Sequence, residues 1–397
     1  MLEFERRYFD VSTMDEMSEA TFFFSSSFRT LIGSDLEPIG VPPNPTPQQL
    51  LAVATEALGA DDRTMGNVPT IVGAIPFFNT SSSALFLSKV NSSPAFDVRA
   101  GESSPSLQRP TLARIRAVPE PDDYVHGVRI ALDLIEAGRL EKVVLARTLE
   151  IDLVSDLDTT NLLSTLTRRN QHGFTFVVPV MAAQQEVRHL FLGASPELLV
   201  RRVGRMVTSN PLAGSTRRGA TPEEDRRNAE ALLSSAKDRH EHDVVVAAVK
   251  RSLQPFCSNL DVPSTPSLLQ TPTVWHLSTV ITGELADPMV SALELALALH
   301  PTPAVCGQPT ELSGQAIAAI EPFKRDLYAG LVGWSDVNGD GEWAVAIRCA
   351  EVRGRWIRLF AGAGIVRGSN PEAELAETAA KLRTMLTALG IEGENTP

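Results

Sequence analysis

Three apolar, strand-forming runs stand close together near the C-terminal end of the chain, and they constrain its fold more than any other feature. The runs are LYAGLVGWSD (327–336), EWAVAIRCAEV (342–352) and RWIRLFAGAGIV (355–366), separated by short Gly-rich turns. Parallel strands need long crossover connections, whereas turns this short join antiparallel neighbours. The block therefore predicts an antiparallel meander.

Strand-like and helix-like segments alternate through the rest of the chain. ATFFFSSSFRTLIG and PTIVGAIPFF, both within residues 1–120, are typical of strands, and residues 222–254 predict one long helix that begins after Thr221. We find no internal repeat and no clean linker between two halves. The pattern favours one intertwined α+β domain over residues 1–397.

Composition narrows the functional classes. The net charge is −12 and no basic block occurs, which argues against a nucleic-acid surface and favours a small substrate held by a few placed cations. The three cysteines are widely spaced in apolar contexts, so neither a disulfide framework nor a zinc site is indicated. No run of about 18 apolar residues and no secretory leader pattern is present. We therefore expect a cytoplasmic protein that binds neither membrane nor nucleic acid.

The stretch AKDRHEHDVVV (236–246) combines acids and histidines ahead of an apolar run. His240 and His242 are two residues apart, so on a helix they point about 200° away from one another and cannot face one ion. Asp238 and Glu241, at i and i+3, share a face instead. Such a pair alone is usually a solvated surface.

A second acid pair makes a metal site more plausible. In NPEAELAETAAKLRTML (370–386), Glu374 and Glu377 again stand at i and i+3, and Lys381 continues that face. Two acid pairs on two helices are the minimum needed to bracket a hard cation such as Mg²⁺, which prefers carboxylate oxygens. Spacing alone does not bring the two helices together.

The stretch SDVNGDGEWAVAI (335–347) offers a competing metal site. Asp336, Asn338 and Asp340 match the first half of a calcium-binding EF-hand loop, but Ile347 stands where that loop requires a glutamate. Strand-like sequence on both sides predicts a hairpin turn instead, with Gly339 supplying a positive φ.

Three charged residues stand in apolar, strand-like surroundings. Burial would raise the pKa of Glu197, in GASPELLV, and suit it to act as a general acid, although a carboxyl on a turn in water is equally compatible. Burial would lower the pKa of Lys142, in LEKVVLARTLEI, and make its neutral amine a base, but the residues alone favour a solvent-facing lysine at a strand edge. Arg348, in WAVAIRCAEV, requires a protein acid or a carboxylate ligand as its partner.

Two glycine-containing stretches could approach a ligand closely. NPLAGSTRRG (210–219) can offer backbone N–H groups to an anion without being a Walker loop. FAGAGIV (360–366) permits close backbone approach, or simply tight strand packing.

The ordered set of motifs resembles the chorismate-utilising enzymes, and within them the isochorismate synthases of siderophore or menaquinone pathways. The motifs are GASPELL, PLAGSTRRG, KDRHEH, HPTPAVCG, YAGLVGW, EWAVAIRCA, FAGAGIV and ELAETAAK. The resemblance is strong over about residues 120–390 and fainter over 1–120. It implies a single α+β domain with two large β-sheets packed face to face and helices outside.

The resemblance also implies a metal site and substrate contacts. Mg²⁺ would be held by Glu241 and Glu377, with Asp238 and Glu374 in support. The substrate-binding positions implied are Gly214, Ala304, Val305, Tyr328, Ile347, Arg348, Gly362 and Lys381.

By the same resemblance, Lys142 is the general base that activates water for attack at ring C2 of chorismate, and Glu197 is the general acid that protonates the departing C4 hydroxyl. Relatives that add ammonia lack this lysine and usually work with a glutaminase subunit, so neither amination nor such a partner is expected. A monomer is our expectation.

Two positions bear on the product. Salicylate synthases typically carry threonine at the position of Ala304, which favours stopping at isochorismate, but they often share a tyrosine at the position of Tyr328. A salicylate synthase with pyruvate-lyase activity, or a chorismate-binding protein without turnover, therefore remain the alternatives. The second alternative would require Lys142 or Glu197 to face solvent.

Overall fold

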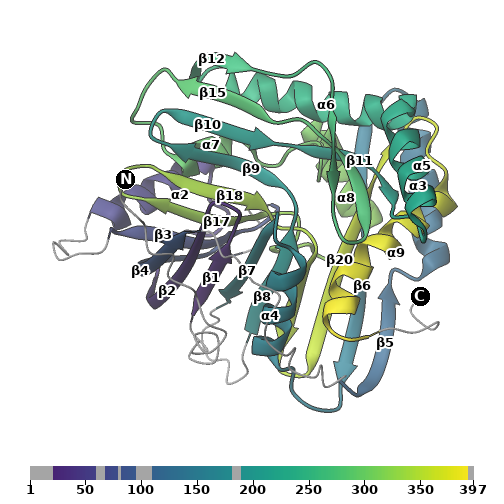
Figure 1. The fold of residues 1–397 in the computed structure, drawn as a ribbon, viewed down its shortest axis with the longest axis horizontal. Helices are drawn as coiled ribbons and strands as arrows, with labels where there is room; N and C mark the ends of the chain where they lie inside the picture. The colour runs from purple at the N-terminus through teal and green to yellow at the C-terminus, as the bar shows by residue number, and fades with distance from the viewer. Residues whose placement is uncertain (1–20, 60–67, 79–81, 95–109, 181–188, 392–397) are drawn as a thin grey trace.

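The computed structural model describes residues 21–59, 68–78, 82–94, 110–180 and 189–391 (Figure 1). The N-terminal stretch in which we sought a leader pattern lies outside these residues. The helices are α2 (Pro47–Gly59), α3 (Pro121–Glu136), α4 (Thr159–Arg169), α5 (Pro222–Ser234), α6 (Ala236–Leu253), α7 (Ala292–Leu299), α8 (Thr310–Ile320) and α9 (Pro371–Ala388).

Twenty strands are described. They are β1 (Phe22–Ser25), β2 (Arg29–Pro38), β3 (Thr70–Ile75), β4 (Ala84–Pro94), β5 (Leu112–Val118), β6 (Lys142–Leu153), β7 (Phe174–Pro179), β8 (His189–Ser195), β9 (Leu198–Val203), β10 (Met206–Asn210), β11 (Leu212–Arg217), β12 (Cys257–Asp261), β13 (Ser267–Gln270), β14 (Val274–Ser278), β15 (Ile281–Leu285), β16 (Gly307–Gln308), β17 (Leu331–Asp336), β18 (Gly341–Val345), β19 (Cys349–Arg353) and β20 (Trp356–Val366).

Most strands join one curled antiparallel sheet. Following its hydrogen-bonded neighbours, the order is β5-β6-β20-β19-β8-β7-β1-β2-β4-β3-β17-β18-β9-β10-β15-β12, with β16 beside the start of β6. A separate small sheet has the order β11-β14-β13. The predicted α+β class with outer helices is confirmed. The two large sheets of the prediction are hydrogen-bonded to one another and form one continuous sheet.

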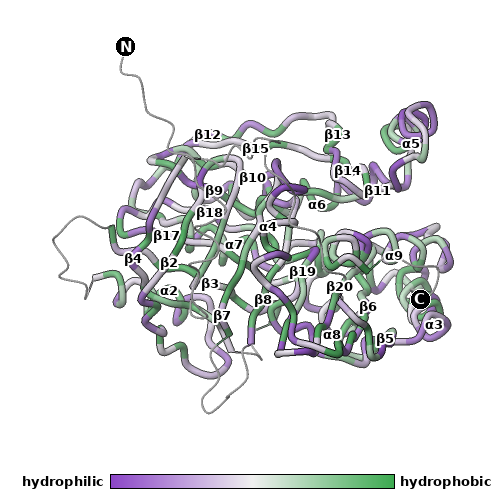
Figure 2. Tube along the Cα trace, turned by 60° about the horizontal axis from the view of Figure 1, so that its bottom comes forward, coloured by the Kyte–Doolittle hydropathy of each residue, from purple (hydrophilic) through white to green (hydrophobic). Residues whose placement is uncertain are grey.

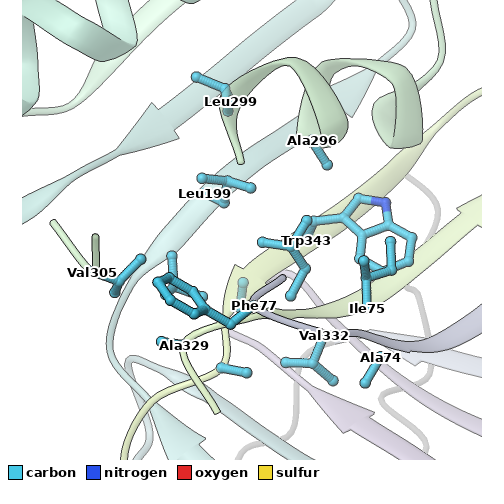
Figure 3. Close-up of a cluster of buried hydrophobic side chains, with 14 of the residues drawn as sticks. Ala74, Ile75, Phe77, Leu199, Ala296, Leu299, Val305, Ala329, Val332 and Trp343 are labelled. Atoms are coloured by element: carbon cyan, nitrogen blue, oxygen red, sulfur yellow. The ribbon is translucent and has the colours of Figure 1, made fainter. Parts of the chain in front are cut away.

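The curled sheet buries apolar side chains on both faces. One core includes Trp343, Ile75 and Leu199 and packs against α7 (Figure 3). On the other face, Leu149 and Leu359 pack under α4 and α9. The strands carry long hydrophobic stretches in Figure 2, as expected where both faces are covered. This packing gives the site a rigid floor.

The predicted meander is wrong in its second run, although the hairpin turn at Gly339 is confirmed. Residues 342–352 form two strands, because the chain bends at Arg348, whose φ is +51°. β18 pairs with β17 and β9, whereas β19 pairs with β20 and β8. A positive φ is rare for arginine, so composition gave no sign of the break.

The helix expected over residues 222–254 is also interrupted. α5 ends at Ser234 and α6 begins at Ala236, because Ser235 adopts an extended conformation and its side chain accepts a hydrogen bond from the Asp238 N–H. A serine in this position satisfies a backbone donor in the first turn of a helix. The break therefore starts a new helix, α6, just before the face that carries Asp238 and Glu241.

None of the helices in the described ranges is long and apolar enough to cross a membrane.

Candidate active site

One pocket gathers most of the residues that the sequence singled out. It encloses about 610 Å³ of space between atoms, part of which is open to solvent. Its lining includes Glu197, Gly214, Glu241, Ala304, Val305, Tyr328, Ile347, Arg348, Gly362, Glu377 and Lys381. Lys142, Asp238 and Glu374 lie outside this lining. Lys142 pairs with Glu241 and Asp238 packs against Gly214, and both of these partners line the pocket.

Glu197 follows β8 and is only 3% exposed. Burial raises the pKa of its carboxyl to about 7, against the lowering effect of a hydrogen bond from the Leu212 N–H. The Ser195 hydroxyl fixes the turn by accepting from the Glu197 N–H and donating to the Val345 carbonyl. A carboxyl with this pKa is about half protonated at neutral pH and can act as an acid.

Arg348 projects from the break between β18 and β19 and is 5% exposed. Burial lowers the pKa of its guanidinium to about 10. No carboxylate within the described ranges forms an ion pair with it, and its hydrogen-bond partner is His276 Nε2, 3.2 Å from Nη2. A buried cation without an acid is costly unless a ligand supplies the charge. The pocket is therefore suited to a carboxylate.

Lys142 and Glu241 form a buried ion pair beside the pocket. Lys142 is fully buried, and its Nζ lies 2.9 Å from Glu241 Oε1. Burial alone would raise the pKa of Glu241, but the charge of Lys142 holds it below the usual value. The solvent-facing alternative for Lys142 is wrong, because β6 is covered on both sides where it begins.

One lysine bridges α6 and α9, and a second pairs with an acid within α9 itself. Lys237 Nζ on α6 lies 2.8 Å from Glu374 Oε1 on α9, and Lys381 Nζ lies 2.6 Å from Glu377 Oε1. Burial and the neighbouring charge of Glu377 raise the pKa of Glu374, despite Lys237. The two acidic faces predicted from spacing therefore meet at one place.

Asp238 stands at the start of the α6 face. Burial raises the pKa of its carboxyl. Gly214, at a φ of +70°, packs against it so closely that an added Cβ would lie 3.0 Å from the Asp238 Cβ. The Gly214 backbone also forms a hydrogen bond with His276, which connects the loop to Arg348.

The predicted metal ligands are of the chemical type that a hard cation such as Mg²⁺ prefers. All four predicted metal ligands are carboxylates. Burial and, after it, the charges of neighbouring carboxylates raise the pKa of Asp238 and Glu374, and a divalent cation would offset both effects. In the described ranges, no group of three or more His, Cys, Asp or Glu side chains is already spaced to hold an ion. Lysines pair instead with three of the four acids, Glu241, Glu374 and Glu377.

The two histidines of the HEH stretch lie apart from one another. The side chain of His240 is 57% exposed and faces Glu141 at 3.9 Å. His242 is buried, and its Nε2 lies 2.7 Å from the Thr279 hydroxyl. Neither lines the pocket.

Comparison with known proteins identifies the family. The family model for chorismate binding enzymes matches residues 79–390. The chain belongs to this family. Isochorismate synthase DhbC of Bacillus subtilis is 48% identical over 387 residues, with 96% of each chain covered. Isochorismate synthase EntC of Escherichia coli K12 is 40% identical, covering 96% of this chain and 97% of its own.

Solved structures agree with these sequence relatives. DhbC from Bacillus anthracis superposes with a TM-score of 0.88 at 41% identity, covering 96% of this chain and 99% of its own. MenF, the menaquinone-specific isochorismate synthase from Escherichia coli, has a TM-score of 0.79 at 26% identity, with coverages of 96% and 91%.

In this chorismate-binding enzyme, a buried ion pair supports the loop that carries Ala304 and Val305. Arg325 pairs with Glu321 and donates to the carbonyls of Val305 and Val144, at 2.8 and 2.7 Å. Glu321 also accepts from the Ala146 N–H. The pair thus ties the loop to β6, next to Lys142.

Sequence reasoning missed His276, Lys237 and Phe360. Phe360 stacks on Tyr328 at 4.8 Å between ring centroids, and both line the pocket. His276 and Lys237 act through partners distant in sequence, so no local pattern marked them. Gly364 was detectable, because it lies in the FAGAGIV stretch.

Gly364 gives the first prediction. A Cβ on this residue would lie 2.1 Å from Glu241 Oε1 and 3.0 Å from Lys142 Cε. We expect Gly364→Ala to displace this pair and to reduce turnover of chorismate at least tenfold, while the far-ultraviolet circular dichroism spectrum stays native. Gly40→Ala is the control, since an added Cβ there meets nothing within 4 Å. Equal rates in the two variants would contradict the role given to the close approach.

Proposed function

We propose that this chorismate-binding enzyme is an isochorismate synthase, which moves the hydroxyl group of chorismate from ring C4 to C2. The observation that carries the proposal is the placement of a buried acid, Glu197, and a buried lysine, Lys142, around a pocket that also presents the unpaired Arg348. The named functions of its relatives support the same activity.

The reaction needs one proton acceptor and one proton donor. In the reacting complex Lys142 is the neutral amine, no longer paired as an ammonium with Glu241, and it takes a proton from water as the water oxygen attacks C2. The ring double bond shifts, the C4–O bond breaks, and Glu197 gives its proton to the departing hydroxyl, which leaves as water. Atoms and charge balance without a redox partner. A carboxyl pKa of about 7 suits the donor role near neutral pH.

The substrate's two carboxylates require positive charge in an acidic protein. Arg348 and Lys381 both line the pocket and would neutralise them. Glu241 and Glu377, supported by Asp238 and Glu374, would hold Mg²⁺, which would supply the charge that fixes the ring carboxylate. Gly214 and Gly362 would offer backbone N–H groups, while Ala304, Val305, Tyr328 and Ile347 shape the pocket.

Stopping at isochorismate is favoured by the small side chain at position 304. A salicylate synthase, which goes on to eliminate pyruvate, is the second candidate, favoured by Tyr328. A binding protein without turnover is disfavoured, because both Lys142 and Glu197 are buried. We expect a cytoplasmic monomer without a glutaminase subunit, whose product feeds siderophore, salicylate or menaquinone synthesis.

The test is incubation of the purified protein with chorismate in two separate samples, one containing MgCl₂ and the other EDTA. The products are then separated by chromatography. We expect isochorismate alone, formed only with Mg²⁺. Salicylate and pyruvate in equal amounts would instead establish the second candidate, and undiminished turnover in EDTA would reject the metal site. Absence of any product would leave a binding protein.

A further inference from the structure

Two cavities adjoin the catalytic pocket on the side of Arg348. The nearer is lined by residues of α4, of the 271–273 loop and of α9, and it shares Arg348 and Pro196 with the catalytic pocket. The farther shares Arg169, Asn170, Pro196, Thr271 and Pro272 with the nearer one. We call these two neighbouring cavities, which share lining residues, the arginine vestibule.

The vestibule carries positive charge that the described chain does not neutralise. Arg168, Arg169 and Arg383 line it and form no ion pair within the described ranges, and no described Asp or Glu lines either cavity. Arg218 also lines it, but Asp225 binds its guanidinium through both oxygens, at 2.7 and 2.6 Å. The imbalance is notable in a chain with 48 acidic and 36 basic residues.

Helix stability explains only part of this arrangement. Arg168 and Arg169 lie in the last turn of α4, where cations interact favourably with the helix dipole. Arg383 is not in the last turn of α9, so the dipole gives no reason for it. It nevertheless lines the same cavity as Arg169 and Arg348.

We propose that the arginine vestibule is the capture route for the dianionic substrate, with Arg169 and Arg383 as positioning residues that attract its carboxylates and pass them to Arg348. This inference rests on the proposed function. A cleft of one charge sign raises the local concentration of an oppositely charged ligand and its association rate, by about 10- to 1000-fold. Elsewhere, the net negative charge of the protein would repel the same ligand.

The experiment compares Arg169→Glu/Arg383→Glu with wild type in steady-state turnover of chorismate at 20 to 300 mM NaCl. The control is Arg226→Glu/Arg227→Glu on α5, which changes the net charge equally at exposed residues outside the vestibule. We expect kcat/KM at low salt to fall about tenfold in the vestibule variant, with kcat within twofold. We expect the decline of kcat/KM with salt to flatten in that variant alone, because screening weakens long-range attraction.

Equal kcat/KM and equal salt dependence in the two charge-reversed proteins would overturn the proposal. If wild type does not turn over chorismate, the proposed function fails, and the vestibule is tested separately by stopped-flow tryptophan fluorescence with chorismate as the probe. Slower association in the vestibule variant than in the control would then still support the capture route. Equal association rates, or no binding by wild type, would reject it.

Discussion

Replacing Glu197 by glutamine should reduce turnover of chorismate by about 100- to 10,000-fold, the usual contribution of a general acid. Glutamine keeps the shape of the side chain but cannot release the proton that the departing hydroxyl needs. Because burial raises the pKa of Glu197 to about 7, wild-type kcat/KM should also fall as pH rises above that value. Rates measured by chromatography between pH 6 and 9 check both points.

The same substitution should stabilise the fold at alkaline pH. In the unfolded chain the Glu197 carboxyl ionises near its ordinary pKa of 4.5, whereas in the folded protein it keeps its proton up to about 7. Stability is therefore lost as pH rises between these values. Above pH 7 the loss amounts to about 3 kcal/mol, which glutamine avoids.

Urea unfolding at pH 5 and pH 8 measures this difference. Glu197→Gln should gain stability relative to wild type at pH 8 and much less at pH 5. The control, Glu230→Gln, changes a side chain that is 69% exposed and should match wild type at both pH values. A Glu197→Gln protein that turns over normally would remove this residue from the mechanism, and one without the alkaline gain would mean that its carboxyl is not held protonated.

Local spacing predicted the parts of the site that lie on a single element. The i and i+3 pattern placed Asp238 with Glu241 on one helix face, and Glu374 with Glu377 on another. That these faces meet depends on Lys237, which reaches Glu374 from a different helix. Such a contact between residues far apart in sequence follows from packing of the whole domain and leaves no mark on either segment.

Arg348 shows where sequence periodicity fails. Its apolar neighbours predicted one unbroken strand, and its charge predicted a need for a partner. The structure contradicts the first expectation, since the positive φ of Arg348 between β18 and β19 turns the guanidinium toward the pocket. The second stays a prediction, because the partner it calls for would be a carboxylate ligand in that pocket. Backbone strain of this kind occurs at functional sites, where the surrounding fold maintains it. The pattern of hydrophobic residues in the sequence does not reveal such backbone strain.

The second large effect is expected at the Lys142–Glu241 pair. Glu241→Gln should abolish turnover and also lower the free energy of unfolding by about 3 to 5 kcal/mol, because it leaves a fully buried ammonium without its partner. Lys142→Met should abolish turnover at a smaller cost in stability. The cost is smaller because Glu241, once it has lost Lys142, still borders the pocket and is still stabilised by the charges of Lys237 and Lys381.

The double variant Lys142→Met/Glu241→Gln separates catalysis from stability. Removing both charges leaves no unpaired ion, so its free energy of unfolding in urea should recover most of the loss seen in Glu241→Gln. Turnover should stay absent, because neither the base nor the carboxylate is restored. Additive losses of stability would mean that the two side chains do not form a coupled pair. Turnover in the double variant would mean that the water is activated elsewhere in the pocket.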